Sequence, residues 1–187
     1  FHEGVTYFGA QAFRDCKQLT KVVINAPEFT MEGNTFGIMA APYTPMTIYV
    51  ANAEMKTYVE SKLSDHSKTY ITVKAPTAVT DKASLQAAMA EAIKAGEKNI
   101  FIDGTNFTGD LNYGFSNANL PAGVTVTIRN AKVTATSKWN YLNGKLVFEN
   151  CEFTAGLYSI HFDDSDGVGD VVFKNCKLVG WLPFAAI

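Results

Sequence analysis

A six-residue pattern recurs three times in the second half of the chain. Each copy runs apolar, charged, asparagine, small, charged, apolar, and the copies begin at Ile128, Phe148 and Phe173. The steps between them are 20 and 25 residues, which is the period of one coil in a solenoid. The repeat therefore predicts a mainly β chain whose coils stack with equivalent residues in register.

Aligning an earlier coil at Ile102 extends the pattern to four coils. Apolar residues stand two positions before each alignment point, at Ile100, Val126, Leu146 and Val171. Apolar residues also stand five positions after it, at Phe107, Val133, Phe153 and Leu178. The intervening column is mixed and is expected to face outward, at Phe101, Thr127, Val147 and Val172.

The apolar alternation changes phase at Asn130, Asn150 and Asn175, so each strand must bend there. Asparagine tolerates the left-handed backbone conformation that such a corner needs. Stacked from coil to coil, the three side chains are expected to form a hydrogen-bonded ladder. Gly104 occupies the equivalent position in the first coil and is expected to make the same corner.

Residues 81–95 carry the clearest helical pattern of the chain. Thr80 is the expected N-cap, Leu85 and Met89 lie on one apolar stripe, and Gly96 ends the helix. A helix laid across the first coil would shield the open end of a β-solenoid.

This helix, the asparagines and the apolar columns resemble the right-handed parallel β-helix of the pectate-lyase-like superfamily. The resemblance covers about residues 78–187 and implies a second module over residues 75–187, truncated after about four coils.

The first module, residues 1–74, has a different repeat. Small and apolar residues recur at regular spacing up to Ile24. A weaker copy of this pattern follows, in which Phe36 stands 23 residues after Phe13, a spacing within the range of leucine-rich repeats. A short helix over 52–59 is expected to cover the strand at 47–50 and to close the stack.

Residues 4–73 resemble the BspA-like leucine-rich repeats of bacterial surface proteins. The resemblance rests on a set of small, aromatic and aliphatic positions: Phe8, Gly9, Ala12, Phe13, Cys16, Leu19, Val22, Ile24 and Tyr58. The sequence departs from it at Ala26 and Ala51, where a proline is usual. The resemblance implies an extracellular or cell-surface bacterial protein that functions in adhesion or in binding host protein or polysaccharide.

The amino-acid composition limits the kinds of binding partner and of structure that are expected. The chain of 187 residues is 47% apolar and 18% charged with a net charge of −2, and it has no basic stripe, so nucleic acid is not expected. No apolar run is long enough to predict a membrane span. The three cysteines argue against a disulfide framework, and Cys151 and Cys176 are expected to be buried free thiols. The terminal sequences suggest a fragment of a longer protein.

Two groups of residues are candidates for ligand binding. Aromatic side chains stack on sugar rings and dominate many recognition surfaces, which favours Trp139, Tyr141 and Tyr158; they can equally fill the core. The densest polar cluster contains His161, Asp163, Asp164 and Asp166. Its carboxylates could bind Ca²⁺, although an Asp- and Gly-rich turn between coils explains the cluster as well.

No residue is assigned to catalysis or to a resident metal, and no cofactor is implied apart from the weak case for Ca²⁺. Long static sheets favour a non-catalytic binding protein. Two alternatives remain open. The first is a fragment of a carbohydrate-active enzyme, a polysaccharide lyase or glycoside hydrolase; the second is a structural spacer.

Overall fold

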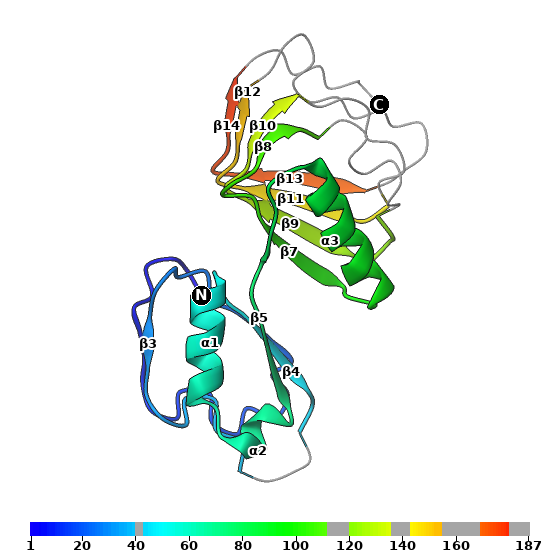
Figure 1. Cartoon of the computed structure of the whole chain (residues 1–187). Coiled ribbons are helices and arrows are strands. Elements are labelled where there is room, and N and C mark those ends of the chain that lie inside the picture. Colours follow the sequence, from blue (N-terminus) through cyan, green and yellow to red (C-terminus); the bar gives the residue numbers. More distant parts are fainter. Residues whose placement is uncertain (40–42, 112–119, 136–142, 155–168, 180–187) are drawn as a thin grey trace. The chain divides into compact units, whose positions relative to one another are not determined.

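The computed structural model describes residues 1–39, 43–111, 120–135, 143–154 and 169–179. The chain divides into two compact units, Phe1–Pro76 and Thr77–Ile187 (Figure 1). The model is mainly β, and its strands form four all-parallel sheets of short stacked strands. This agrees with the solenoid-like parallel architecture expected from the repeats.

The first unit contains two parallel sheets, ordered β1-β3 and β2-β4-β5. Its elements are β1 (Tyr7–Phe8), β2 (Lys21–Val23), β3 (Thr30–Met31), β4 (Met46–Tyr49), α1 (Ala53–Lys62), α2 (Asp65–Lys68) and β5 (Ile71–Lys74). Tyr7 lies opposite Thr30 in the pairing of β1 with β3. The rings of Phe13 and Phe36 stack with their centroids 5.0 Å apart. The 23-residue step is therefore a real structural repeat in this unit.

The expected short helix is present as α1, with Asn52 as its N-cap; the Asn52 side chain accepts a hydrogen bond from the Met55 amide at 2.8 Å. The expectation that it closes the stack was wrong. The chain returns after α1 and α2 to add β5 beside β4. The signal was the alternation of buried Ile71 and Val73 around exposed Thr72, which is typical of a strand with one buried face.

The second unit builds each coil from two strands. Its elements are β6 (Thr77–Ala78), α3 (Lys82–Lys94), β7 (Asn99–Asp103), β8 (Thr108–Asp110), β9 (Thr125–Arg129), β10 (Lys132–Ala135), β11 (Lys145–Glu149), β12 (Glu152–Thr154), β13 (Asp170–Lys174) and β14 (Lys177–Val179). One sheet is ordered β13-β11-β9-β7-β6 and the other β14-β12-β10-β8.

The register confirms the alignment of the four coils in the first sheet. Ile102 lies opposite Ile128, Ile128 opposite Phe148, and Phe148 opposite Phe173. The rings of Phe148 and Phe173 stack with their centroids 5.4 Å apart. Equivalent side chains therefore form continuous apolar columns along the core.

Helix α3 packs on the same core, where Leu85 and Met89 are buried with Ile100 and Ile102. Its N-cap is Asp81, not Thr80 as expected. The Asp81 carboxylate accepts from the Ser84 amide at 2.8 Å, and the Ser84 hydroxyl oxygen accepts from the Asp81 amide at 3.1 Å. This reciprocal pair satisfies two amides that the helix cannot pair itself.

The mixed column expected to face outward is not uniformly exposed. Thr127 is only 6% exposed and Val147 only 4%, whereas Phe101 and Val172 at either side are partly exposed. Thr127 and Val147 lie in central strands, with in-register neighbours on both sides. Such neighbours screen even the outer face of a central strand.

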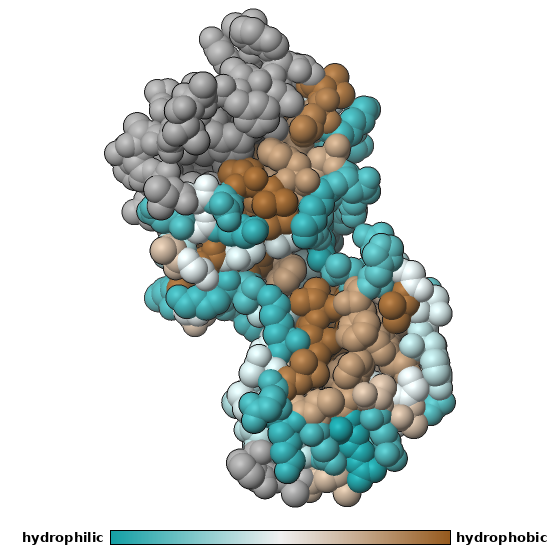
Figure 2. Space-filling view, turned by 180° about the vertical axis from the view of Figure 1, so that it is seen from behind, coloured by the Kyte–Doolittle hydropathy of each residue, from teal (hydrophilic) through white to brown (hydrophobic). Residues whose placement is uncertain are grey.

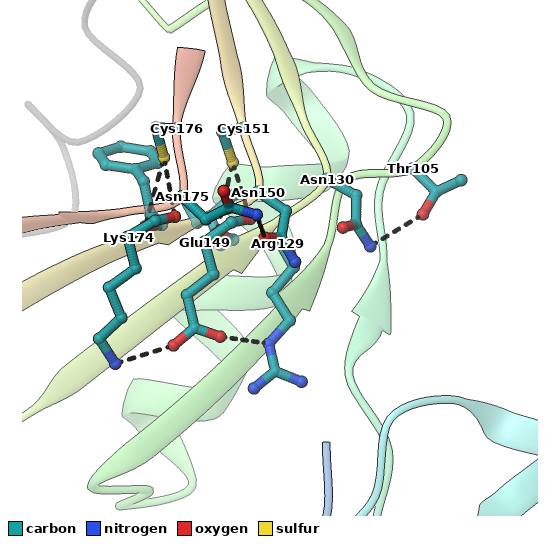
Figure 3. Close-up of polar contacts among 11 residues, drawn as sticks. Thr105, Arg129, Asn130, Glu149, Asn150, Cys151, Lys174, Asn175 and Cys176 are labelled. Atoms are coloured by element: carbon teal, nitrogen blue, oxygen red, sulfur yellow. Dashed lines mark hydrogen bonds and ion pairs between the residues drawn. The ribbon is translucent and has the colours of Figure 1, made fainter. Parts of the chain in front are cut away.

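The asparagine corners are confirmed. Asn130, Asn150 and Asn175 have φ values of 60°, 55° and 50°. Asn175 donates to the Asn150 side chain at 2.7 Å, and Asn130 donates to the Thr105 hydroxyl at 3.3 Å (Figure 3). The asparagine of the second coil thus bonds to a threonine of the first.

Gly104 makes a different corner from the one expected, because it is not among the residues with positive φ. Its amide donates to the Arg129 carbonyl at 2.8 Å, and a Cβ at this position would lie 2.7 Å from the Ala131 Cβ. Val133 consequently pairs with Gly109 rather than with Phe107. Glycine is required here by close approach to the next coil.

We predict that Asn150→Ala lowers the free energy of unfolding by about 1–2 kcal/mol. Alanine lacks the short polar side chain that lets asparagine adopt the left-handed conformation, and the substitution also removes the ladder hydrogen bond. Asn150→Gly retains the backbone conformation and should cost less. Urea denaturation followed by circular dichroism measures both. An equal or larger loss with glycine would mean that the conformational argument is wrong.

We predict that Gly104→Ala destabilises the second unit by about 1–3 kcal/mol, because the new methyl group overlaps the neighbouring coil. Gly109→Ala is the matched control, since the nearest atom lies 4.0 Å from its added Cβ. The two variants are compared by thermal unfolding. Equal stability would show that the coils separate at Gly104 without cost.

Candidate functional site

All seven residues predicted to bind a ligand lie outside the described residues: Trp139, Tyr141, Tyr158, His161, Asp163, Asp164 and Asp166. Their positions along the chain are informative nevertheless. Segment 136–142 joins β10 to β11, and segment 155–168 joins β12 to β13. Both segments therefore connect the second strand of one coil to the first strand of the next.

The strands that anchor these segments are stacked. β10 pairs with β12, and β11 pairs with β13, each in parallel. Both segments thus start at the C-terminal ends of neighbouring strands in one sheet. Both end at the N-terminal ends of neighbouring strands in the other sheet. The ligand-binding prediction itself stays a prediction.

A polar cavity lies where the segments rejoin the sheet. It has a volume of about 220 Å³ and is lined by Gly123, Val124, Thr125, Asn143, Gly144, Lys145, Gly169 and Asp170. Asn143 directly follows one segment and Gly169 directly follows the other. Amide, ammonium, carboxylate and hydroxyl groups are thus available within one concavity.

The backbone around this cavity is tightly held. The Asn143 amide donates to the Leu120 carbonyl at 3.1 Å, and the Lys145 amide donates to the Val124 carbonyl at 2.8 Å. A Cβ at Gly144 would lie 2.5 Å from the Val124 carbonyl oxygen. Glycine therefore lets two coils approach closely beside the cavity, which fixes its polar groups on rigid strands.

An alternating charge column that the sequence analysis missed runs across the first sheet. Asp103, Arg129, Glu149 and Lys174 lie opposite one another in successive strands. Glu149 accepts from the Arg129 Nε at 2.8 Å and from the Lys174 Nζ at 3.0 Å (Figure 3). The signal was available in the aligned repeats, since the residue before each corner alternates in sign.

The side chains of Arg129 and Glu149 are 12% and 17% exposed, whereas that of Lys174 is 60% exposed. The Arg129 guanidinium also lies over the Phe101 ring, 5.4 Å from its centroid. Arg129 therefore supports the stacking of the coils through a cation–π contact and an ion pair.

The second sheet carries a similar contact. Lys177 on β14 donates to Glu152 on β12 at 2.7 Å. The hydrogen bond and charge of Lys177 lower the pKa of the Glu152 carboxyl. Opposite charges thus pair from coil to coil on both sheets.

The cysteines are free thiols. Cys151 is buried, as expected, and its burial raises the pKa of the thiol to about 12. Cys176 is only partly buried, because it lies in the last described coil. Both thiols donate to a carbonyl of the preceding coil at 3.5 Å, Cys151 to Ile128 and Cys176 to Phe148.

A second cavity, of about 500 Å³, lies in the first unit beside α1 and β5. Two of its lysines already have carboxylate partners: Lys56 lies 4.0 Å from Glu60, and Lys68 lies 3.5 Å from Asp65. Its floor is formed by β5.

Within the described ranges, no cluster of three or more His, Cys, Asp or Glu residues could hold a metal ion. The acidic residues proposed for Ca²⁺ lie outside these ranges. No helix in the described part of the chain is long and apolar enough to cross a membrane. Figure 2 shows apolar areas bordered by hydrophilic residues on both units.

Comparison of the chain with protein-family models, with curated proteins and with solved structures finds no match.

We predict that Glu149→Ala lowers the free energy of unfolding by about 1–3 kcal/mol, because it leaves the mostly buried Arg129 without this carboxylate partner. Glu152→Ala is the control, since its partner Lys177 is 69% exposed and exposed ion pairs contribute little. Chemical denaturation of both variants measures the difference. An equal loss of unfolding free energy in both variants would show that the charge column does not contribute more to stability than an exposed ion pair.

Proposed function

We propose that this chain is a non-catalytic binding part of a secreted or cell-surface bacterial protein, and that it binds a polysaccharide through the second unit. The binding surface consists of the polar cavity and of the connecting segments 136–142 and 155–168. Alternatively, the chain binds a host protein and functions in adhesion. That binding would use the same aromatic residues, Trp139, Tyr141 and Tyr158.

The observation that carries this proposal is the position of the polar cavity. Thr125, Lys145 and Asp170 lie on strands, and Asn143 lies just before β11. Together they offer the hydrogen-bond donors and acceptors that a hydroxyl-rich ligand requires. The adjoining segments contain Trp139, Tyr141 and Tyr158, whose rings can stack on sugars. Polar groups held on a rigid scaffold bind with a small loss of conformational entropy.

The charge column favours binding over polysaccharide cleavage. A lyase of the β-helix type uses a basic residue as the proton acceptor, and Arg129 is the one arginine in the second module. Its Nε donates to Glu149 at 2.8 Å. A guanidinium committed to a neighbouring coil is poorly placed to act on a substrate.

We also propose the finer assignment of the two units. The second is a right-handed parallel β-helix of the pectate-lyase-like type, supported by its two strands per coil, its asparagine corners and helix α3. Right-handed crossovers are strongly favoured between parallel strands. The first is the end of a BspA-like leucine-rich-repeat domain, supported by its 23-residue step.

The test is binding of the chain to an array of plant, microbial and host glycans, with and without Ca²⁺. We expect reproducible binding to at least one polysaccharide class. Ca²⁺ dependence would assign a role to Asp163, Asp164 and Asp166. A blank array would overturn the polysaccharide form and leave protein adhesion or spacing.

Variants locate the site. Trp139→Ala, Tyr158→Ala and Asn143→Ala are each expected to weaken binding by about tenfold, the effect of losing a stacking or hydrogen-bonding group. Lys177→Ala, on the other sheet, is the matched control. Circular dichroism shows whether each variant folds. Loss of the fold in both aromatic variants would show that these rings belong to the core.

A further inference from the structure

The polar cavity of the second unit contains a column of three different polar groups. Thr125 and Asp170 each lie opposite Lys145 in the pairing of β11 with β9 and with β13. All three residues line the cavity. Neighbouring strands lie roughly 4.8 Å apart, so a hydroxyl, an ammonium and a carboxylate group follow one another at this spacing across three coils.

The charged members of this column are close together and accessible. The Lys145 Nζ lies 3.9 Å from the Asp170 Oδ2, and the two side chains are 46% and 74% exposed. This separation is longer than that of a charged hydrogen bond. Both groups can therefore bond to a third group that is placed beside them.

A sugar hydroxyl has the chemistry that this pair requires. A hydroxyl oxygen accepts hydrogen bonds and its O–H donates one, so one hydroxyl can accept from Lys145 while it donates to Asp170. An ionised carboxylate only accepts. A uronic acid placed here would bond to Lys145 but would be repelled by Asp170, because the two negative charges lie a few ångströms apart.

The charge balance around the cavity points in the same direction. Lys145 and Asp170 are the charged residues among those described that line the cavity, and their charges cancel. The connecting segments 136–142 and 155–168 contribute one lysine and three aspartates as charged residues. The sequence near the cavity therefore has no surplus of positive charge that would attract an anionic polymer.

From this geometry we propose that the cavity selects a neutral, hydroxyl-rich polysaccharide and rejects polymers of uronic acids. The inference rests on the proposed function and narrows the ligand class of the same site. One ligand hydroxyl bonds to both Lys145 and Asp170, and Thr125 and Asn143 bond to neighbouring hydroxyls. Asp170 determines the specificity, because it is the group that an acidic ligand would face.

The first test compares the two classes of polysaccharide on the glycan array. The neutral members are β-glucans, mannans and galactans, and the acidic members are polygalacturonate, alginate and hyaluronan. Ca²⁺ is left out, so that no cation bridges two carboxylates. We expect binding to a neutral polymer and binding to the acidic ones that is weaker by roughly tenfold or more.

A matched probe separates charge from sugar identity. The neutral polymer that binds is oxidised at C6, which converts primary hydroxyls into carboxylates on the same backbone. The oxidised polymer should bind roughly tenfold more weakly than its parent. Raising the salt concentration should reduce this difference, because salt screens the repulsion by Asp170.

The decisive variant is Asp170→Asn, which removes the negative charge and keeps an oxygen acceptor. It should raise the affinity for the oxidised polymer by roughly three- to tenfold, with a smaller change for the neutral parent. Glu152→Gln is the matched control. It changes the net charge of the chain equally, at a carboxylate that also pairs with a lysine of the neighbouring coil but lies on the other sheet.

Affinity electrophoresis in gels that contain each polymer measures all of these affinities, and circular dichroism confirms that both variants fold. The proposal is overturned if the unmodified chain binds acidic polymers as tightly as neutral ones. It is also overturned if Asp170→Asn brings no gain, or if Glu152→Gln brings the same gain. In these three cases polysaccharide binding stands and only its selectivity fails. A chain that binds neither class contradicts the proposed function as well.

Discussion

The in-register pairing of parallel strands is the interaction on which the second unit depends. Each coil exchanges backbone hydrogen bonds with the next, with Ile128 opposite Phe148 and Phe148 opposite Phe173. This register places chemically equivalent residues about one strand spacing apart, near 4.8 Å. Each residue in a column therefore contacts the equivalent residues of the coils before and after it. The two must be compatible, whether they are apolar, charged or at a corner.

Three kinds of column satisfy this requirement in different ways. Apolar side chains stack, as Phe148 does on Phe173. Asparagines bond to one another, as Asn175 does to Asn150. Charged residues cannot repeat with the same sign, so they alternate, and Glu149 lies between Arg129 and Lys174. The alternation explains how charged residues before the corners contribute to stability.

Function is consequently expected in the connections, where stacking imposes the weakest constraint. Segments 136–142 and 155–168 differ in length and composition although the strands that anchor them are equivalent. A rigid scaffold with variable connections is the usual arrangement of a binding protein.

The sequence by itself determined the coil register, the asparagine corners and the helix over 82–94, because each of these depends on repeated or local patterns. It did not determine the burial of Thr127 and Val147, since screening by adjacent strands exists only once the sheet is assembled. The tertiary structure also decided the corner at Gly104 and the return of the chain to form β5. The alternation at residues 71–73 marks β5 as a strand, but its pairing with β4 and the close approach of coils at Gly104 are contacts between residues distant in the chain, which a local pattern cannot encode.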